Sequence, residues 1–153
     1  MNKTVAYCAL LLVGFLLIAV TVLRPEIMSD NNRFLKEFVN SNILAILGVL
    51  LTITLASAAQ IHLALNEVES KIGHSFLHKT RTGVHGAAYW LIWLFILSVL
   101  VVFLKPYFYS SLYWQSFFNG AAVFILFWMV LIMSSLMKLV FAIKPHFDND
   151  HTS

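Results

Sequence analysis

The chain has 153 residues, of which 60% are hydrophobic and only 11% are charged, and its mean hydropathy is +0.84. Soluble domains carry about 25% charged residues, so this composition is typical of an integral membrane protein. The formal net charge of +3 is too small to indicate nucleic-acid binding. The single cysteine, Cys8, excludes an intrachain disulfide and CxxC redox chemistry.

Four apolar stretches of about 20 residues contain no Asp, Glu or Arg. A helix of that length crosses a hydrocarbon core about 30 Å thick and satisfies its own backbone hydrogen bonds. The sequence therefore predicts an all-α membrane protein with four transmembrane helices, at residues 5–23, 43–65, 87–104 and 118–137. We expect residues 1–144 to form one four-helix transmembrane domain and residues 145–153 to form a polar tail.

The segment between the first two spans, residues 24–42, has an amphipathic pattern. Phe34, Leu35, Phe38 and Val39 recur at helical spacing, and Ser29 or Asp30 precedes them as a candidate N-cap. We predict a short helix here. Such a helix either lies in the headgroup layer or forms a vestibule or partner-docking element.

The second predicted helix is longer than the membrane requires. Its helical pattern continues from Ile43 to Ile72, before Gly73, and about 30 residues span about 45 Å. We expect this helix to project into the cytoplasm. One of its faces carries small residues at spacings of three and four, which allow another helix to approach closely: Gly48, Thr52, Ala56 and Ala59.

A neighbouring stripe on the same helix is more polar. Its members recur every three or four residues: Val49, Ile53, Ser57, Gln60, Ala64 and Glu67. In a homo-oligomer with this helix at its centre, such as a tetramer, the stripe would line a pore in which Ile53 is a constriction that gates by dewetting. The alternative is that Ser57 and Gln60 bond to the backbone or to a neighbouring helix.

The distribution of basic residues predicts the orientation. One side of the predicted spans has Lys3, Lys71, Lys79, Arg81, Lys138 and Lys144, and the other has Arg24, Arg33, Lys36 and Lys105. The first group is larger, which favours cytoplasmic N- and C-termini.

A basic, histidine-containing segment follows the second helix. Its members are Lys71, His74, His78, Lys79 and Arg81. The segment is expected either to contact anionic headgroups or to receive a cytosolic partner or an anionic ligand. His74 and His78 would share a helix face, but the spacing supplies no definite third ligand, so no metal site is predicted.

Several kinds of catalytic site are missing from the sequence. The spans contain no acidic residue of the kind that proton-coupled transporters use. We find no Ser-His-Asp set, no paired carboxylates and no phosphate-binding glycine loop. The sequence therefore predicts neither an enzyme nor a cofactor.

Three features of the chain resemble small four-helix membrane effectors of bacterial phage-defence systems, such as phage-exclusion channels of the RexB kind and the membrane subunits of Kiwa or Hailong systems. They are the apolar run Asn42–Gly48, the small-residue run Leu55–Ala59, and the extension Asn66–Glu69 followed by a basic turn. The resemblance covers the layout of the whole chain and transfers no catalytic residue.

The resemblance implies a homo-oligomeric channel or membrane-disrupting effector in the bacterial inner membrane. Such an effector would stay closed until a cytosolic defence protein or ligand reports infection. The alternative function is a non-conducting membrane anchor or assembly subunit that recruits a soluble partner through the basic segment.

Overall fold

The structure is a computed structural model that describes residues 3–72 and 78–143. Within these ranges, side chains are described except at residues 3, 64, 67–72, 78–80 and 139–143.

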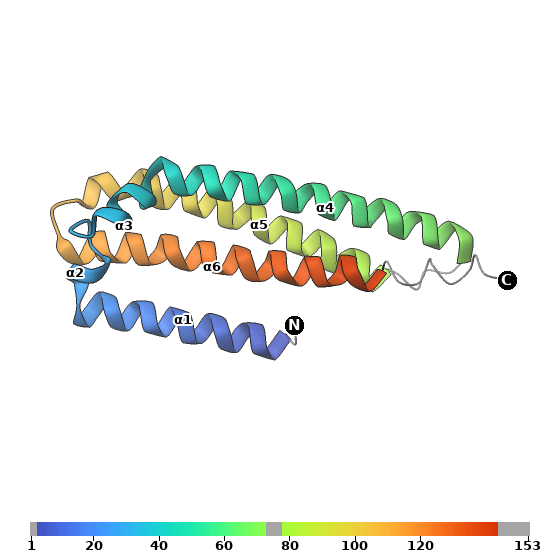
Figure 1. Ribbon diagram of the computed structural model, residues 1–153, viewed down its shortest axis with the longest axis horizontal. Helices are drawn as coiled ribbons and strands as arrows, with labels where there is room; N and C mark the ends of the chain where they lie inside the picture. The colour runs from blue at the N-terminus through green and yellow to red at the C-terminus, as the bar shows by residue number, and fades with distance from the viewer. Residues whose placement is uncertain (1–2, 73–77, 144–153) are drawn as a thin grey trace.

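Four long helices run side by side along the molecule (Figure 1): α1 (Lys3–Leu23), α4 (Ile43–Ile72), α5 (His78–Leu104) and α6 (Leu112–Ile143). Each contains a stretch long and apolar enough to cross a membrane, and the mean hydropathies of these stretches lie between 2.1 and 2.7. The described residues contain no strand. The prediction of an all-α protein with four candidate membrane spans is confirmed.

The short elements gather at one end of the molecule, which we call the cap end. They are α2 (Pro25–Met28), α3 (Arg33–Glu37), η1 (Phe38–Asn42) and η3 (Lys105–Phe108). Val39 and Asn40 depart from helical backbone angles, so η1 is a kink and regular helix begins at Ile43. The opposite end, where α4 ends and α5 begins, is called the far end.

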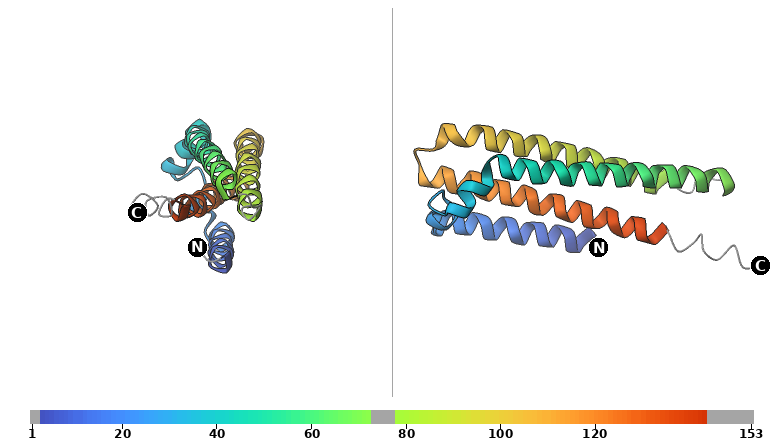
Figure 2. Two further views of the ribbon diagram at one scale, coloured as in Figure 1. Left: turned by 90° about the vertical axis from the view of Figure 1, so that its right-hand side faces the viewer. Right: turned by 45° about the horizontal axis from the view of Figure 1, so that its top comes forward.

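The core is built by three of the four long helices. Buried apolar side chains of α4, α5 and α6 meet in one cluster, which includes Leu47, Leu91 and Met129. α1 lies along the side of α6 that faces away from α4, as the end-on view in Figure 2 shows. Leu17 is the one buried side chain among the described residues of α1. The arrangement is therefore three packed helices with a fourth attached to one of them.

Glycine lets α1 approach α6 closely. A β-carbon on Gly14 would lie 3.3 Å from Cε2 of Phe124, and one on Gly120 would lie 3.5 Å from Oγ1 of Thr21. Small residues commonly bring helices together in membranes, where dispersion contacts replace the hydrophobic effect. The Gly14–Phe124 contact is the tighter of the two.

The chain between α1 and α4, residues 24–42, is called the cap. Its amphipathic pattern correctly predicts a short helix, but the predicted N-caps, Ser29 and Asp30, are wrong. Asn32 caps α3 instead, because its Oδ1 accepts hydrogen bonds from the backbone N–H groups of Phe34 and Leu35 at 3.1 and 3.5 Å. The Ser29 hydroxyl donates to the carbonyl of Glu26 at 3.0 Å.

α4 has 30 residues and covers the predicted range. Its candidate membrane span ends at Leu63. A helix of this length measures about 45 Å, whereas a hydrocarbon core is about 30 Å thick. That the last turns of α4 extend beyond the membrane and into the cytoplasm stays a prediction.

We expect Gly14→Leu to separate α1 from α6 and to lower stability by about 1–3 kcal/mol, because the larger side chain would overlap Phe124. Thermal unfolding in detergent micelles measures the change. Gly86→Leu is the matched control, because a β-carbon there would meet nothing within 4 Å. Equal melting temperatures for the two variants would contradict the proposed contact.

Candidate functional site

The two predicted stripes of α4 share one outward-facing surface, which we call the outward face of α4. Thr52, Ala56 and Ala59 are exposed along it, and so are Val49 and Ile53, at 60% and 51%. The opposite surface of the helix is buried in the core through residues such as Ile43, Leu47 and Ile61. Gly48 is half-buried, and a β-carbon there would lie 3.9 Å from Phe95 of α5.

Two hydroxyl groups on α4 are satisfied within the helix itself. Ser57 Oγ donates to the carbonyl of Ile53 at 2.9 Å, and Thr52 Oγ1 donates to the carbonyl of Gly48 at 2.9 Å. For Ser57 this is the backbone bonding that the alternative interpretation expects. It leaves the hydroxyl oxygen on the outward face, where a lone pair can still accept from water.

Gln60 differs from these hydroxyl residues. Its side chain is exposed, and it makes no hydrogen bond with any described residue. An amide with two donors and one acceptor needs partners wherever lipid replaces water, and leaving it unpaired costs several kcal/mol. Of the described polar residues of the stripe, Gln60 is therefore the one that requires water, a headgroup or another protein surface.

Much of the predicted basic surface lies outside the described residues. This holds for His74, and for the side chains of Lys71, His78 and Lys79. Two members of the polar stripe, Ala64 and Glu67, also lie where side chains are not described. Their predicted roles remain predictions.

Arg81 is the described member of the basic segment, and it contacts a histidine of α4. Its Nη2 lies 3.0 Å from Nε2 of His62. The His62 ring also meets the ring of His85 edge-on, with centroids 5.2 Å apart. The far ends of α4 and α5 are thus joined by polar side chains within the protein, a contact that the sequence analysis did not predict.

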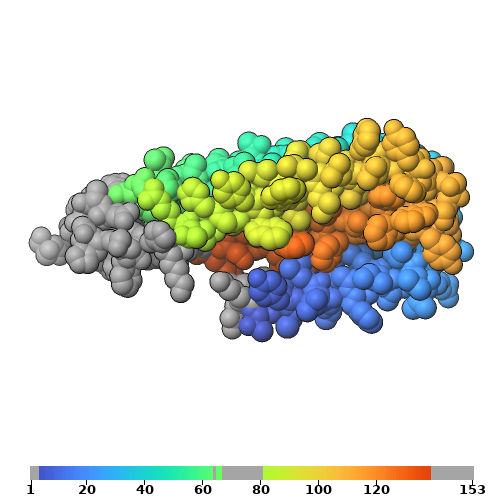
Figure 3. Space-filling model, turned by 180° about the vertical axis from the view of Figure 1, so that it is seen from behind, coloured from blue at the N-terminus to red at the C-terminus, as the bar shows by residue number. Residues whose placement is uncertain are grey.

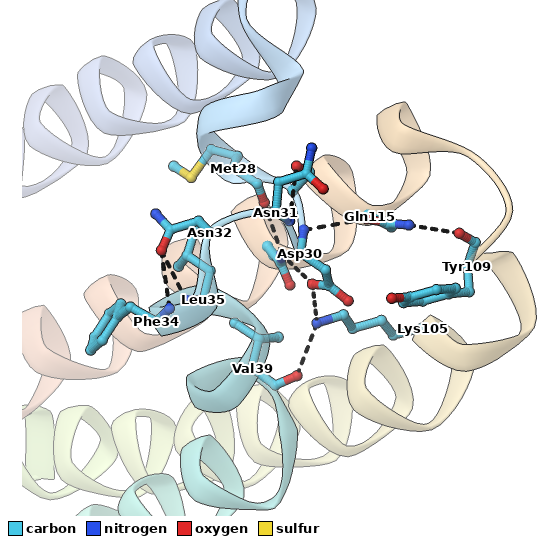
Figure 4. Close-up of polar contacts among 12 residues, drawn as sticks. Met28, Asp30, Asn31, Asn32, Phe34, Leu35, Val39, Lys105, Tyr109 and Gln115 are labelled. Carbon is cyan, nitrogen blue, oxygen red and sulfur yellow. Dashed lines mark hydrogen bonds and ion pairs between the residues drawn. The ribbon is translucent and has the colours of Figure 1, made fainter.

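A second polar cluster lies at the cap end and was also not predicted (Figure 4). Lys105 Nζ lies 2.8 Å from Asp30 Oδ1, and the two side chains are only 8% and 5% exposed. Lys105 Nζ also donates to the carbonyl of Val39 at 3.3 Å. This ion pair joins the cap to η3, which directly follows α5, across 75 residues of sequence.

Amide side chains of α6 complete the cluster. Asn119 Nδ2 donates to the carbonyl of Met28 at 2.8 Å and to Asp30 Oδ1 at 3.0 Å. Gln115 Oε1 accepts from the Asp30 backbone N–H at 3.3 Å, and Gln115 Nε2 donates to the carbonyl of Tyr109 at 2.6 Å. The Asp30 carboxylate therefore binds one cation and one amide donor, which offsets the cost of burying its charge.

The sequence contained one signal for this cluster. Asn119 lies inside the fourth predicted span, where a polar amide needs a protein partner. Lys105 directly precedes Pro106, which cannot continue the helix, so α5 gives way to η3 at that point. The pairing itself could not be read from the sequence, because Asp30 and Lys105 carried only the charge expected at a membrane surface.

The described residues contain no group of three His, Cys, Asp or Glu side chains that could hold a metal ion. The pair of His62 and His85 faces Arg81, a cation that would oppose metal binding at the same place.

Comparison with known proteins gives no match: no family model fits the sequence, and no curated protein or solved structure is significantly similar to it.

We expect Lys105→Met to lower stability by about 3–5 kcal/mol, because it leaves the Asp30 carboxylate buried without its cation. The double variant Lys105→Met with Asp30→Leu is expected to recover most of that loss, since neither charge then remains. Thermal unfolding in micelles measures both. A double variant less stable than Lys105→Met alone would contradict the ion-pair account.

Proposed function

We propose that the protein is a homo-oligomeric channel or membrane-perturbing effector of the bacterial inner membrane, assembled through the outward face of α4. The observation that carries the proposal is the position of this face. It presents small residues for close helix contact directly beside a polar stripe, and Thr52, Ala56, Ala59 and Gln60 of the two stripes are exposed outside the chain's own core. A second copy packed on this face would give the small residues a close helix contact and the polar stripe a protein surface to face.

The location of α1 supports this assembly. α1 packs on α6 and α2, and it lies on the far side of α6 from α4 (Figure 2). It therefore leaves the outward face of α4 open to a neighbour in the membrane plane. Contacts among Thr52, Ala56 and Ala59 of adjacent copies would bring the Val49, Ile53, Ser57 and Gln60 positions to the centre of the assembly.

The chemistry of the stripe suggests how such a pore would work. Val49 and Ile53 would form an apolar constriction that excludes water when narrow. Ser57 and Gln60 would hold water on the far side of it. Water in the pore, or a Gln60 of another copy, would also supply the hydrogen-bonding partner that Gln60 lacks within the described chain.

The phage-defence role rests on the resemblance of the sequence to small defence effectors. In this proposal the basic segment from Lys71 to Arg81 faces the cytoplasm and receives the triggering protein or ligand. The N- and C-termini lie on the same side, as the basic residues near the helix ends favour.

Oligomerisation can be tested with single cysteines in a Cys8→Ser background. We expect Ala56→Cys and Ala59→Cys to form disulfide-linked dimers in membranes, because both positions would lie at the contact between copies. Gly86→Cys, on an open part of α5, is the matched control and should remain monomeric. Equal cross-linking at all three positions would indicate random collision rather than a specific interface.

Conduction can be tested by recording currents of the purified protein in planar bilayers. We expect the double variant Ser57→Leu and Gln60→Leu to reduce single-channel conductance severalfold, because it removes the polar lining. Ser135→Leu is the matched control, since Ser135 is also exposed and bonds back to its own helix, to Leu131 at 3.0 Å.

An unchanged conductance in the double variant would place the pore elsewhere. A protein that stays silent even with its cytosolic partner added would favour the non-conducting anchor.

A further inference from the structure

A groove runs between α1 and α5, over α6, toward the far end of the molecule, and we call it the far-end furrow. Its volume is about 440 Å³, which lies within the range of about 300–1,000 Å³ that small-molecule sites occupy. Figure 3 shows α1 and α5 as two ridges with a hollow between them. All three helices line the furrow, through residues that include Tyr7, Leu10, Gly83, Ala87, Trp128 and Leu131.

The floor of the furrow is aromatic, and its wall on α5 lacks a side chain at one position. The ring of Trp90 stacks on Trp128 with centroids 5.6 Å apart, and Phe124 meets Trp128 edge-on at 5.9 Å. A β-carbon on Gly83 would meet nothing within 4 Å. The chain's own side chains therefore leave an apolar space, whose lining gains dispersion contacts only when other atoms fill it.

The depth of the furrow matches one leaflet of a bilayer. The candidate membrane spans of α1, α5 and α6 have their far-end limits at Thr4, Arg81 and Lys138. Trp128 lies ten residues before Lys138, which is about 15 Å along the helix. Half of a hydrocarbon core is also about 15 Å thick. An acyl chain whose headgroup lies beside Lys138 would therefore end near Trp128.

The open end of the furrow carries a cation and a phenol. Lys138 is exposed and makes no ion pair with any described residue. It follows Leu131 by seven positions, which places both residues on one face of α6. Tyr7, on the α1 wall, is 66% exposed, and its hydroxyl has no partner in the described part of the chain. The lining residues include no carboxylate that could bind an ammonium group, so this end suits an anionic headgroup.

We propose that the far-end furrow binds one anionic phospholipid, such as phosphatidylglycerol. One acyl chain lies in the furrow against Trp128, where Gly83 leaves it room, and the phosphate oxygens accept from Lys138 and Tyr7. The lipid joins α1 to α5, whereas α1 itself packs mainly on α6 and α2. The inference goes beyond the proposed function and is independent of it, because α4 contributes no residue to the furrow.

Native mass spectrometry of the full-length protein in mild detergent tests the site, with phosphatidylglycerol or phosphatidylcholine of the same acyl chains added. We expect one phosphatidylglycerol to be retained per chain, about fivefold more tightly than phosphatidylcholine, as one lysine beside an anionic headgroup provides. Equal retention of the two lipids would overturn the proposal. A random distribution of adducts, with no preference for one per chain, would overturn it as well.

Two variants with matched controls locate the lipid. Gly83→Leu fills the furrow and should abolish retention, whereas Gly86→Leu, equally open but outside the furrow, should retain the lipid. Lys138→Gln should remove the preference for phosphatidylglycerol, and Lys36→Gln, which changes an exposed lysine at the cap end, should leave it unchanged. Equal retention by Gly83→Leu and Gly86→Leu would place the lipid elsewhere and overturn the proposal. A dimer without lipid that is lost in Gly83→Leu would show that a second copy covers the furrow instead.

Fluorescence quenching provides a second measurement that does not depend on the glycine variants. Phosphatidylglycerol brominated on its acyl chains quenches the tryptophans that it contacts. We expect Trp128→Phe to lower the quenched fraction more than Trp114→Phe, because Trp114 lies near the start of α6 at the cap end. An equal effect of the two substitutions would contradict an acyl chain in the furrow.

Discussion

The hydrocarbon core of a membrane offers no hydrogen-bonding partners, and this constraint determines where the polar groups of the chain lie. Thr54 and Ser98, buried inside the three-helix core, return their hydroxyls to backbone carbonyls of their own helices. Ser57 and Ser135 do the same on exposed surfaces. Polar side chains that join different elements occur near the ends of the bundle, where Lys105 and other long side chains can meet partners across the chain.

The same constraint explains why one helix stands apart. α4, α5 and α6 share a core of apolar side chains, whereas α1 is attached through close contacts such as Gly14 with Phe124. Its remaining surface, including Leu11 and Phe15, is apolar and exposed. A helix of this composition is stable against lipid without further partners, so it need not enter the core. Figure 3 shows α1 as a separate ridge beside the bundle.

Hydropathy over about 20 residues was sufficient to predict the four spans, because the cost of placing polar groups in lipid dominates at that scale. The same reasoning could not predict the cap. Asp30 is a residue type that often caps helices, but its carboxylate pairs with Lys105 of η3, and Asn32 caps α3. The contact of His62 with Arg81 was missed for the same reason. Both interactions depend on how separate helices meet, and a single sequence without contact information does not specify that register.

The two ends of the bundle are held by different kinds of interaction. At the cap end a buried ion pair, two amide side chains and several backbone groups join the cap to η3 and α6. Toward the far end, buried apolar side chains such as Ile61, Leu65 and Val84 hold α4 against α5, and Arg81 lies 3.0 Å from His62. The exposed residues of the outward face of α4, such as Thr52, Ala56 and Gln60, belong to neither set of contacts. A neighbouring helix in the membrane can therefore pack on this face without breaking the contacts that hold the chain together.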